Sequence, residues 1–430
     1  MKQLDRDILR LAVPAFGALA AEPLYVLADT AIIGHVGTPE LGGLAVASTL
    51  ILSGYSLFVF LAYGTTGTVA RLLGAGESQR AARAGVQALW LAVAIGAGLG
   101  LAGAVLTTPL VALMGASGEV ATHARTYLRV SMAGVPALTL VLAGTGYLRG
   151  LQDTRTPLVV AVSTAVANLL LEIVFVVVLD LGVAGSAWAT VIVQTLAAAS
   201  YVRVVARDVR RNHVPVRPDG RALLGLARVS RDLFLRTVAL RGAFLVATAT
   251  ATRLGTVAVA AHELAFATWS FLALALDSVA IAAQALVAHR LGAADGVGAR
   301  AASARIVQWG VALGAAFAVA VLAASPWLGS VFTDDRRVVD AAVTLFVLVA
   351  LVQPVNGMVF ALDGVLIGAG DQRYLATAMA ALAVAFVAAT VAVPTITWLW
   401  VLLTAFQLGR LVALVRRWAT PRWLVEGTPG

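Results

Sequence analysis

Two carboxylates lie within an otherwise apolar stretch near the start of the sequence: Glu22 and Asp29, in EPLYVLADTAIIGHVG. A charged side chain at the centre of a bilayer costs roughly 2.5 to 3.5 kcal/mol, so such a residue indicates function. Their spacing of about two helical turns places both on one helix face. Pro23 removes a backbone hydrogen bond and offers a hinge. We expect Asp29 to take part in ion coupling, with Glu22 and Tyr25 lining a substrate cavity.

Two further apolar stretches carry polar pairs at helical spacing. ANLLLEIVFVVVLD contains Asn168 and Glu172, and GSAWATVIVQ contains Thr190 and Gln194. Residues four apart lie on one face of a helix. Carboxylate, amide and hydroxyl oxygens suit a proton or a hard cation such as Na⁺. These groups are therefore candidates for a site that binds an ion, and Gln194 is a candidate cavity residue.

The second half of the chain has intramembrane polar groups of its own. The predicted cavity residues there are Asp277 and Gln284 in LALALDSVAIAAQALV, and Asn356 and Asp363 in PVNGMVFALDGVLIG. For Asp277, a purely structural hydrogen bond is the alternative.

Other polar residues of the second half are expected to be structural. His262 and Glu263 lie near the start of a long apolar run, which favours an interfacial role. Arg236 and Arg241 lie near the start of the seventh run. We expect both to snorkel to the cytoplasmic surface, because a long basic side chain can keep its charge in water.

The composition is that of a polytopic membrane protein. Of 430 residues, 60% are hydrophobic and 12% are charged, and the mean hydropathy is +0.91. A soluble domain could not bury so much apolar surface. About twelve runs reach the roughly 20 residues needed to cross a bilayer, so the expected fold class is all-α and integral to the membrane. The runs lie near residues 8–33, 44–70, 86–108, 125–148, 157–179, 184–205, 233–254, 257–288, 306–324, 339–367, 375–395 and 398–415.

The net charge of +9 does not indicate nucleic-acid binding, because the arginines lie in short gaps between apolar runs. If the N-terminus is cytoplasmic, most of these gaps face inward, as the positive-inside rule requires. We expect a plasma-membrane protein with both termini in the cytoplasm, including a tail from Arg410 to Arg422. The polar stretch Arg203–Arg231 is the expected linker. Within it, Asp219–Arg231 is either a helix on the inner leaflet or a solvated connector.

The two halves of the sequence align at one constant shift, which predicts an internal repeat. An even number of helices per repeat predicts two six-helix lobes related by a pseudo-two-fold axis along the membrane normal. The expected domains are an N-lobe at 1–206, the linker at 207–230, and a C-lobe with its cytoplasmic tail at 231–430. The shift places Leu73, Gly74, Pro136, Gly150, Asp153 and Arg155 on Leu291, Gly292, Pro354, Gly368, Asp371 and Arg373.

The repeat does not reproduce the candidate ion-binding groups. We therefore assign these groups to function rather than to packing. At the same shift, Asp29, Asn168, Glu172 and Thr190 meet Ala247, Phe386, Thr390 and Leu408.

Several classes of chemistry are disfavoured. The sequence has no cysteine, which excludes disulfides and thiolate metal sites. It has no Walker A loop, no HExxH, no GxSxG and no GxGxxG after a strand. ATP-driven transport by this chain alone is thus disfavoured, and an ion gradient is the expected energy source. We expect no enzymatic activity, no metal site and no cofactor.

The sequence resembles the multidrug and toxic compound extrusion (MATE) transporters, in particular the branch of DNA-damage-inducible protein F (DinF). The resemblance runs from about Arg6 to Arg416. It implies two six-helix lobes around a central cavity, and export of organic cations or lipophilic drugs in exchange for protons or sodium. Its most specific pieces are EPLYVLADTAIIGHVGTPELGGLAVAS, LRGLQDTRTP, AAHELAFATWSF, LDSVAIAAQALVAHRLGA and DGVLIGAGDQRYL.

The resemblance also implies an ion-coupling site. Proton-coupled members carry an acid on the first helix, an asparagine and an acid one turn apart on the fifth, and a threonine on the sixth. Relatives often have aspartate in place of the second acid, which is a glutamate here. The sodium site of another branch needs an acid on the seventh helix, and the run 233–254 has none, so protons are favoured over Na⁺. The matching residues are Asp29, Asn168, Glu172 and Thr190.

Our hypothesis is a monomeric antiporter that works by alternating access. Protonation of Asp29 from outside would let the first helix rearrange around Pro23 and release a bound cation. One alternative is a flippase for a lipid-linked sugar, which would line its cavity with basic groups, whereas the intramembrane charges here are mostly acidic. Another is an integral-membrane transferase. It would need an aspartate-rich metal motif or a His–acid pair at helical spacing, and only the adjacent His262 and Glu263 come near.

Overall fold

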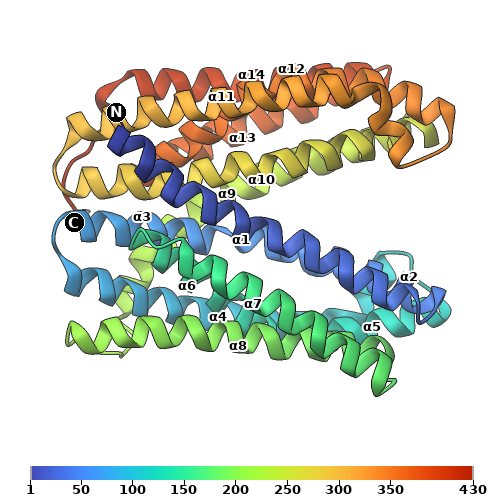
Figure 1. Ribbon diagram of the computed structural model, residues 1–430, viewed down its shortest axis with the longest axis horizontal. Helices are drawn as coiled ribbons and strands as arrows, with labels where there is room; N and C mark the ends of the chain where they lie inside the picture. Colours follow the sequence, from blue (N-terminus) through green and yellow to red (C-terminus); the bar gives the residue numbers. More distant parts are fainter. Residues whose placement is uncertain (1, 429–430) are drawn as a thin grey trace. The chain divides into compact units, whose positions relative to one another are not determined.

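A computed structural model describes residues 2–428, which form helices joined by short turns, with no strand in this range (Figure 1). Within the described residues, eleven helical segments are long and apolar enough to cross a membrane, or twelve if the bent pair α5 and α6 is one span. The predicted all-α, integral-membrane fold is confirmed. The helices are α1 (Lys2–Gly34), α2 (Thr38–Phe58), α3 (Phe60–Gly74), α4 (Ser78–Leu113), α5 (Gly118–Met132), α6 (Val135–Gly150), α7 (Arg155–Glu172), α8 (Gly182–Arg211), α9 (Gly220–Arg253), α10 (Thr256–Gly292), α11 (Gly296–Leu328), α12 (Arg336–Gly368), α13 (Gln372–Ala389) and α14 (Ile396–Ala419).

Contacts divide the chain into two compact units. The N unit is Gly17–Ser230, and the C unit combines the residues up to Phe16 with those from Arg231 onward. The division cuts two helices, α1 and α9. The lobe boundaries expected from the sequence, and the axis relating the lobes, stay predictions.

The segment between the halves is shorter than the sequence suggested. Helix α8 continues to Arg211, residues 212–219 form a turn, and α9 begins at Gly220. The amphipathic stretch Asp219–Arg231 is therefore almost entirely the first part of a long helix that continues to Arg253. Its leucines and arginines have helical periodicity, but no helix breaker separates them from the apolar run that follows.

One hydrophobic cluster of the N unit fixes the position of α1. Ile33 of α1 is fully buried and packs with Leu44 of α2, Leu128 of α5 and Val183 of α8. Since Ile33 follows Asp29 by one helical turn, the same packing directs Asp29 toward α8.

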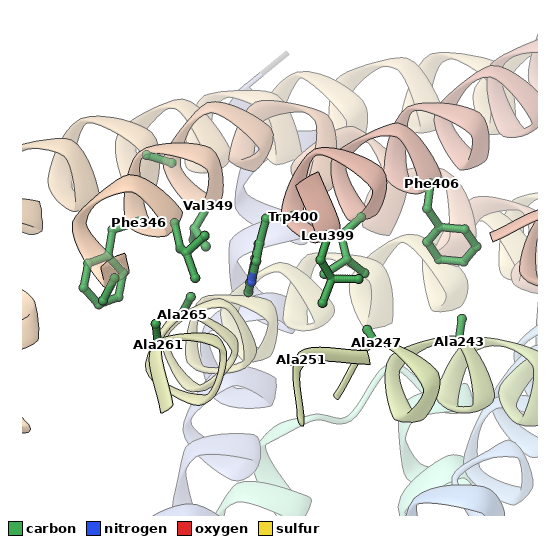
Figure 2. Packing of buried hydrophobic residues seen from close by; sticks show 14 of the residues in the cluster. Ala243, Ala247, Ala251, Ala261, Ala265, Phe346, Val349, Leu399, Trp400 and Phe406 are labelled. Atoms are coloured by element: carbon green, nitrogen blue, oxygen red, sulfur yellow. The ribbon is translucent and has the colours of Figure 1, made fainter. Parts of the chain in front are cut away.

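The C unit is organised around α10, the most deeply buried of its membrane-spanning helices. Small side chains let the helices approach closely, while large ones fill the remaining space. Figure 2 shows alanines of α9 and α10 facing Phe346 and Val349 of α12, together with Leu399, Trp400 and Phe406 of α14.

Helices α11 and α12 meet at Gly310 and Gly357, where the backbones touch: a Cβ on Gly357 would overlap the carbonyl oxygen of Gly310. We expect Gly357→Ala to lower the free energy of unfolding by about 1–3 kcal/mol, because the two helices must separate. The midpoint of thermal unfolding in detergent measures this loss. Gly242→Ala on α9 is the matched control, since a Cβ there meets nothing within 4 Å. Equal midpoints for the two variants would contradict the expected loss.

Candidate ion-binding site

Asp29 lies in the interior of the N unit and is 4% exposed. The hydroxyl of Ser186 on α8 donates a hydrogen bond of 2.6 Å to Asp29 Oδ1. Ser186 is itself buried, as is Thr190 one turn further along α8. The carboxyl of Asp29 thus faces hydroxyl groups and no described cation.

Glu172 and Asn168 lie one turn apart on α7 and are both buried. The α-helix ends at Glu172 and continues as a π-helical segment, η1 (Ile173–Val178). Such segments occur frequently at functional sites, because they break the regular hydrogen-bond ladder. The Glu172 carboxyl lies within electrostatic range of Asp29 and Ser186. The structure therefore brings α1, α7 and α8 together at the predicted residues.

Four oxygens of this cluster have no hydrogen-bond partner among the described residues: Asn168 Oδ1, both carboxyl oxygens of Glu172, and Thr190 Oγ1. A buried polar group without a hydrogen-bond partner lowers stability by about 1–3 kcal/mol, so four such atoms in one cluster need a physical explanation. A proton shared between carboxyls, or a hard cation, would satisfy several oxygens at once.

The predicted cavity residues of α1 lie on the same side of the N unit. Tyr25 is within electrostatic range of Asp29, Glu22 and Glu172. Helix α1 continues through Pro23 without interruption. Gln194 lies one turn beyond Thr190, with its Oε1 against Gly134.

In the C unit, Asp363 belongs to a buried ion cluster. Arg236 of α9 and Arg410 of α14 each donate from NH2 to Asp363 Oδ2 at 2.6 Å. The expectation that Arg236 snorkels to the surface is wrong, because its side chain is 7% exposed and bound to this carboxylate. Arg410, expected in the cytoplasmic tail, is 2% exposed.

The cluster extends to Asn356. Arg410 NH1 donates to Gln407 Oε1 at 2.9 Å, and Gln407 Nε2 donates to Asn356 Oδ1 at 2.6 Å. Both Asn356 and Gln407 are buried. The other two predicted residues of this unit, Asp277 and Gln284, lie on α10, half-buried and buried respectively. Their assignment to a substrate cavity stays a prediction.

The sequence reasoning missed several participants. Ser186 precedes Thr190 by four residues, so helical spacing could have found it. Arg410 was placed at the start of the cytoplasmic tail, and Gln407, three residues before it, was not singled out. Tyr127 of α5, which lies within electrostatic range of Asp29 and Tyr25, had no such signal, since α5 holds no other predicted site residue.

Buried ionisable side chains inside a multi-pass helical fold are typical of membrane transporters. The sequence profile of the MatE family matches residues 14–174 and 233–400. The chain is 32% identical over 431 residues to Protein DETOXIFICATION 44, chloroplastic, of Arabidopsis thaliana, covering 96% of this chain and 81% of that protein. It is 30% identical over 446 residues to DNA damage-inducible protein F of Escherichia coli (strain K12), covering 97% and 94%. The chain belongs to the MatE family, the MATE transporters, and is DinF-like.

A solved structure described as MATE in the bent conformation has the same fold, with a TM-score of 0.87. The match covers 97% of this chain and 95% of the chain in that structure, at 19% sequence identity. This likeness shows the fold. The family profile and the DinF relative confirm the resemblance to MATE transporters seen in the sequence, and with it a multi-pass membrane protein of the efflux-transporter class.

Proposed function

We propose that this MATE transporter exports organic cations or lipophilic drugs in exchange for protons, by alternating access in the plasma membrane. The observation that carries the proposal is the cluster of buried carboxyls and unbonded oxygens around Asp29. Sodium is the alternative coupling ion, and the oxygen ligands also suit it. We propose further that the protein works as a monomer with both termini in the cytoplasm.

In the proposed mechanism, Asp29 takes up a proton from outside. Protonation removes the negative charge and turns one oxygen into a donor, for which the unbonded carboxyl oxygens of Glu172 are candidate acceptors. Helix α1 then rearranges around Pro23, changing the cavity and releasing the substrate. A potential of 100 mV supplies about 2.3 kcal/mol per charge, which together with a pH gradient could drive roughly a hundredfold accumulation.

The coupling ion can be tested directly in proteoliposomes preloaded with ethidium, a fluorescent organic cation. We expect a proton gradient, acid outside, to drive ethidium efflux, and a sodium gradient alone to give less than about a tenth of that rate. Efflux driven by sodium alone would reverse the assignment of the ion. Efflux driven by neither gradient would contradict antiport. Empty liposomes under the same gradients control for leakage.

The alternatives gain no support from the site. A flippase cavity lined by basic groups is not matched by Arg236 and Arg410, since both guanidinium groups bind one carboxylate. A transferase would need His262 and Glu263 together, yet His262 is fully buried beside Thr248 while Glu263 is exposed. Antiport therefore stays the proposed activity.

A further inference from the structure

Helices α1 and α9 occupy equivalent positions in the two halves, and each belongs to both compact units. The constant shift that aligns the halves places Lys2, the first residue of α1, on Gly220, the first residue of α9. The division into units cuts α1 after Phe16 and α9 after Ser230. Each helix begins in one unit and continues into the other, where it carries a buried charged residue, Asp29 on α1 and Arg236 on α9.

The start of α1 is bound to α11 within the C unit. Asp5 Oδ1 accepts hydrogen bonds from Arg305 Nε at 2.6 Å and from Trp309 Nε1 at 2.9 Å, and Asp5 Oδ2 accepts from Arg305 NH2 at 3.0 Å. This carboxylate–guanidinium pair is bidentate, which is the strong and directional form of such a contact. We call these three bonds the Asp5 anchor.

The start of α9 is bound to α4 within the N unit in an equivalent way. Arg83 NH2 donates to Asp219 Oδ2 at 2.6 Å, and Gln87 Oε1 accepts from the backbone N–H of Asp219 at 2.8 Å. Backbone N–H groups of Ala222 and Arg221 lower the pKa of Asp219, so its carboxyl stays ionised at neutral pH.

The Asp5 anchor and the contact of Asp219 with α4 use the same position of the repeat. At the shift that aligns the halves, Gln87 on α4 meets Arg305 on α11. Different side chains at one repeat position thus bind Asp5 in the first turn of α1 and Asp219 directly before α9.

We propose that Asp5 is a positioning residue for ion coupling: the Asp5 anchor holds the start of α1 in the C unit, so that a rearrangement of α1 at Asp29 is transmitted to that unit. This inference rests on the proposed function, in which ion binding at Asp29 rearranges α1. Asp5 and Asp29 are about 36 Å apart along a helix of 1.5 Å rise per residue. A helix can transmit a displacement over that length only if its far end is held.

The transport test compares matched variants in proteoliposomes. Asp5→Asn keeps the side-chain size but weakens the charge-assisted bonds, so proton-driven efflux should fall at least tenfold. Binding of tetraphenylphosphonium, a lipophilic cation, to the purified protein should stay within twofold of the original protein. Asp5→Glu keeps the carboxylate and should restore most of the efflux. Asp7→Asn is the control, because Asp7 bonds to Gln3 of the same helix.

A second test needs no transport. Hydrogen–deuterium exchange in the α11 segment around Arg305 should change at least threefold when Asp29→Asn is introduced. The change should vanish when Asp5→Asn is also present. If Asp5→Asn does not fold, Trp309→Phe removes one bond of the anchor and should give a smaller loss of the same response.

The two tests distinguish the role of the Asp5 anchor from the proposed function. Unaltered exchange in α11 on Asp29→Asn, or Asp5→Asn exporting at the original rate, overturns the role of the anchor. If Asp29→Asn changes exchange in α11 as expected while the original protein shows no ion-driven efflux, the anchor is supported and the proposed function is contradicted instead.

Discussion

Asp29→Asn is expected to abolish proton-driven efflux, lowering the rate at least about a hundredfold, while the protein still folds and reaches the membrane. Asparagine has nearly the same size and keeps an oxygen that can accept the 2.6 Å bond from Ser186. It cannot take up or release a proton, so the coupling step is lost. Replacing a charged residue in the bilayer by a neutral one also removes a cost, which argues against destabilisation. The measurement is ethidium efflux from proteoliposomes under a pH gradient.

Two comparisons make the Asp29 experiment specific. Asp29→Glu keeps a titratable carboxyl and should retain part of the efflux. Efflux by Asp29→Asn, where any remains, should no longer depend on external pH. Undiminished proton-driven efflux by Asp29→Asn would falsify the assignment of Asp29 as the coupling residue.

Much of the fold was predictable because bilayer thickness sets the length of an apolar run. The constant shift between the two halves also pointed to α1 and α9 as equivalent helices. The helix bounds were harder to predict. A hydropathy window treats α2 and α3 as one span, and likewise α5 and α6, although each pair consists of two helices. The continuous helix from Gly220 was missed for a related reason, since its polar first turns look like a connector.

The site was predictable where spacing along one helix decides it, and unpredictable where partners come from different helices. Asn168 and Glu172 share a face of α7 by their spacing alone. The bond from Ser186 to Asp29 joins residues 157 positions apart, and the pairing of Arg236 with Asp363 joins residues 127 apart. A hydropathy profile assigns an arginine at the edge of an apolar run to the surface. The profile contains no information on contacts between distant residues, so it cannot show that a carboxylate lies beside the arginine in the folded chain.

The buried aspartates Asp29 and Asp363 differ in their hydrogen-bond partners. Asp29 receives a hydroxyl bond beside oxygens without partners, whereas two guanidinium groups bind one oxygen of Asp363. Both ion-pair partners of Asp363 are cations, whereas the bond at Asp29 comes from a neutral hydroxyl. We accordingly propose Asp29 as the coupling residue, and expect Asp363 to stabilise the C unit.

Asp363→Asn is expected to lower the free energy of unfolding by about 3–5 kcal/mol, because it removes the carboxylate that two buried guanidinium groups share. Arg410 would retain its bond to Gln407, which carries no charge to offset it. The measurement is the midpoint of thermal unfolding in detergent, together with the amount of folded protein in the membrane. Asp340→Asn is the control, since Asp340 lies on the same helix but is exposed.

A triple variant separates stability from coupling. Replacing a buried ion cluster by apolar residues of similar size is often neutral or stabilising, because no charge then remains to be desolvated. Asp363→Leu combined with Arg236→Met and Arg410→Met should thus recover most of the stability that Asp363→Asn loses. If the role of Asp363 is structural, the triple variant should also regain proton-driven efflux. A stable triple variant without efflux would instead place Asp363 in the transport cycle, as the substrate-cavity prediction from the sequence holds.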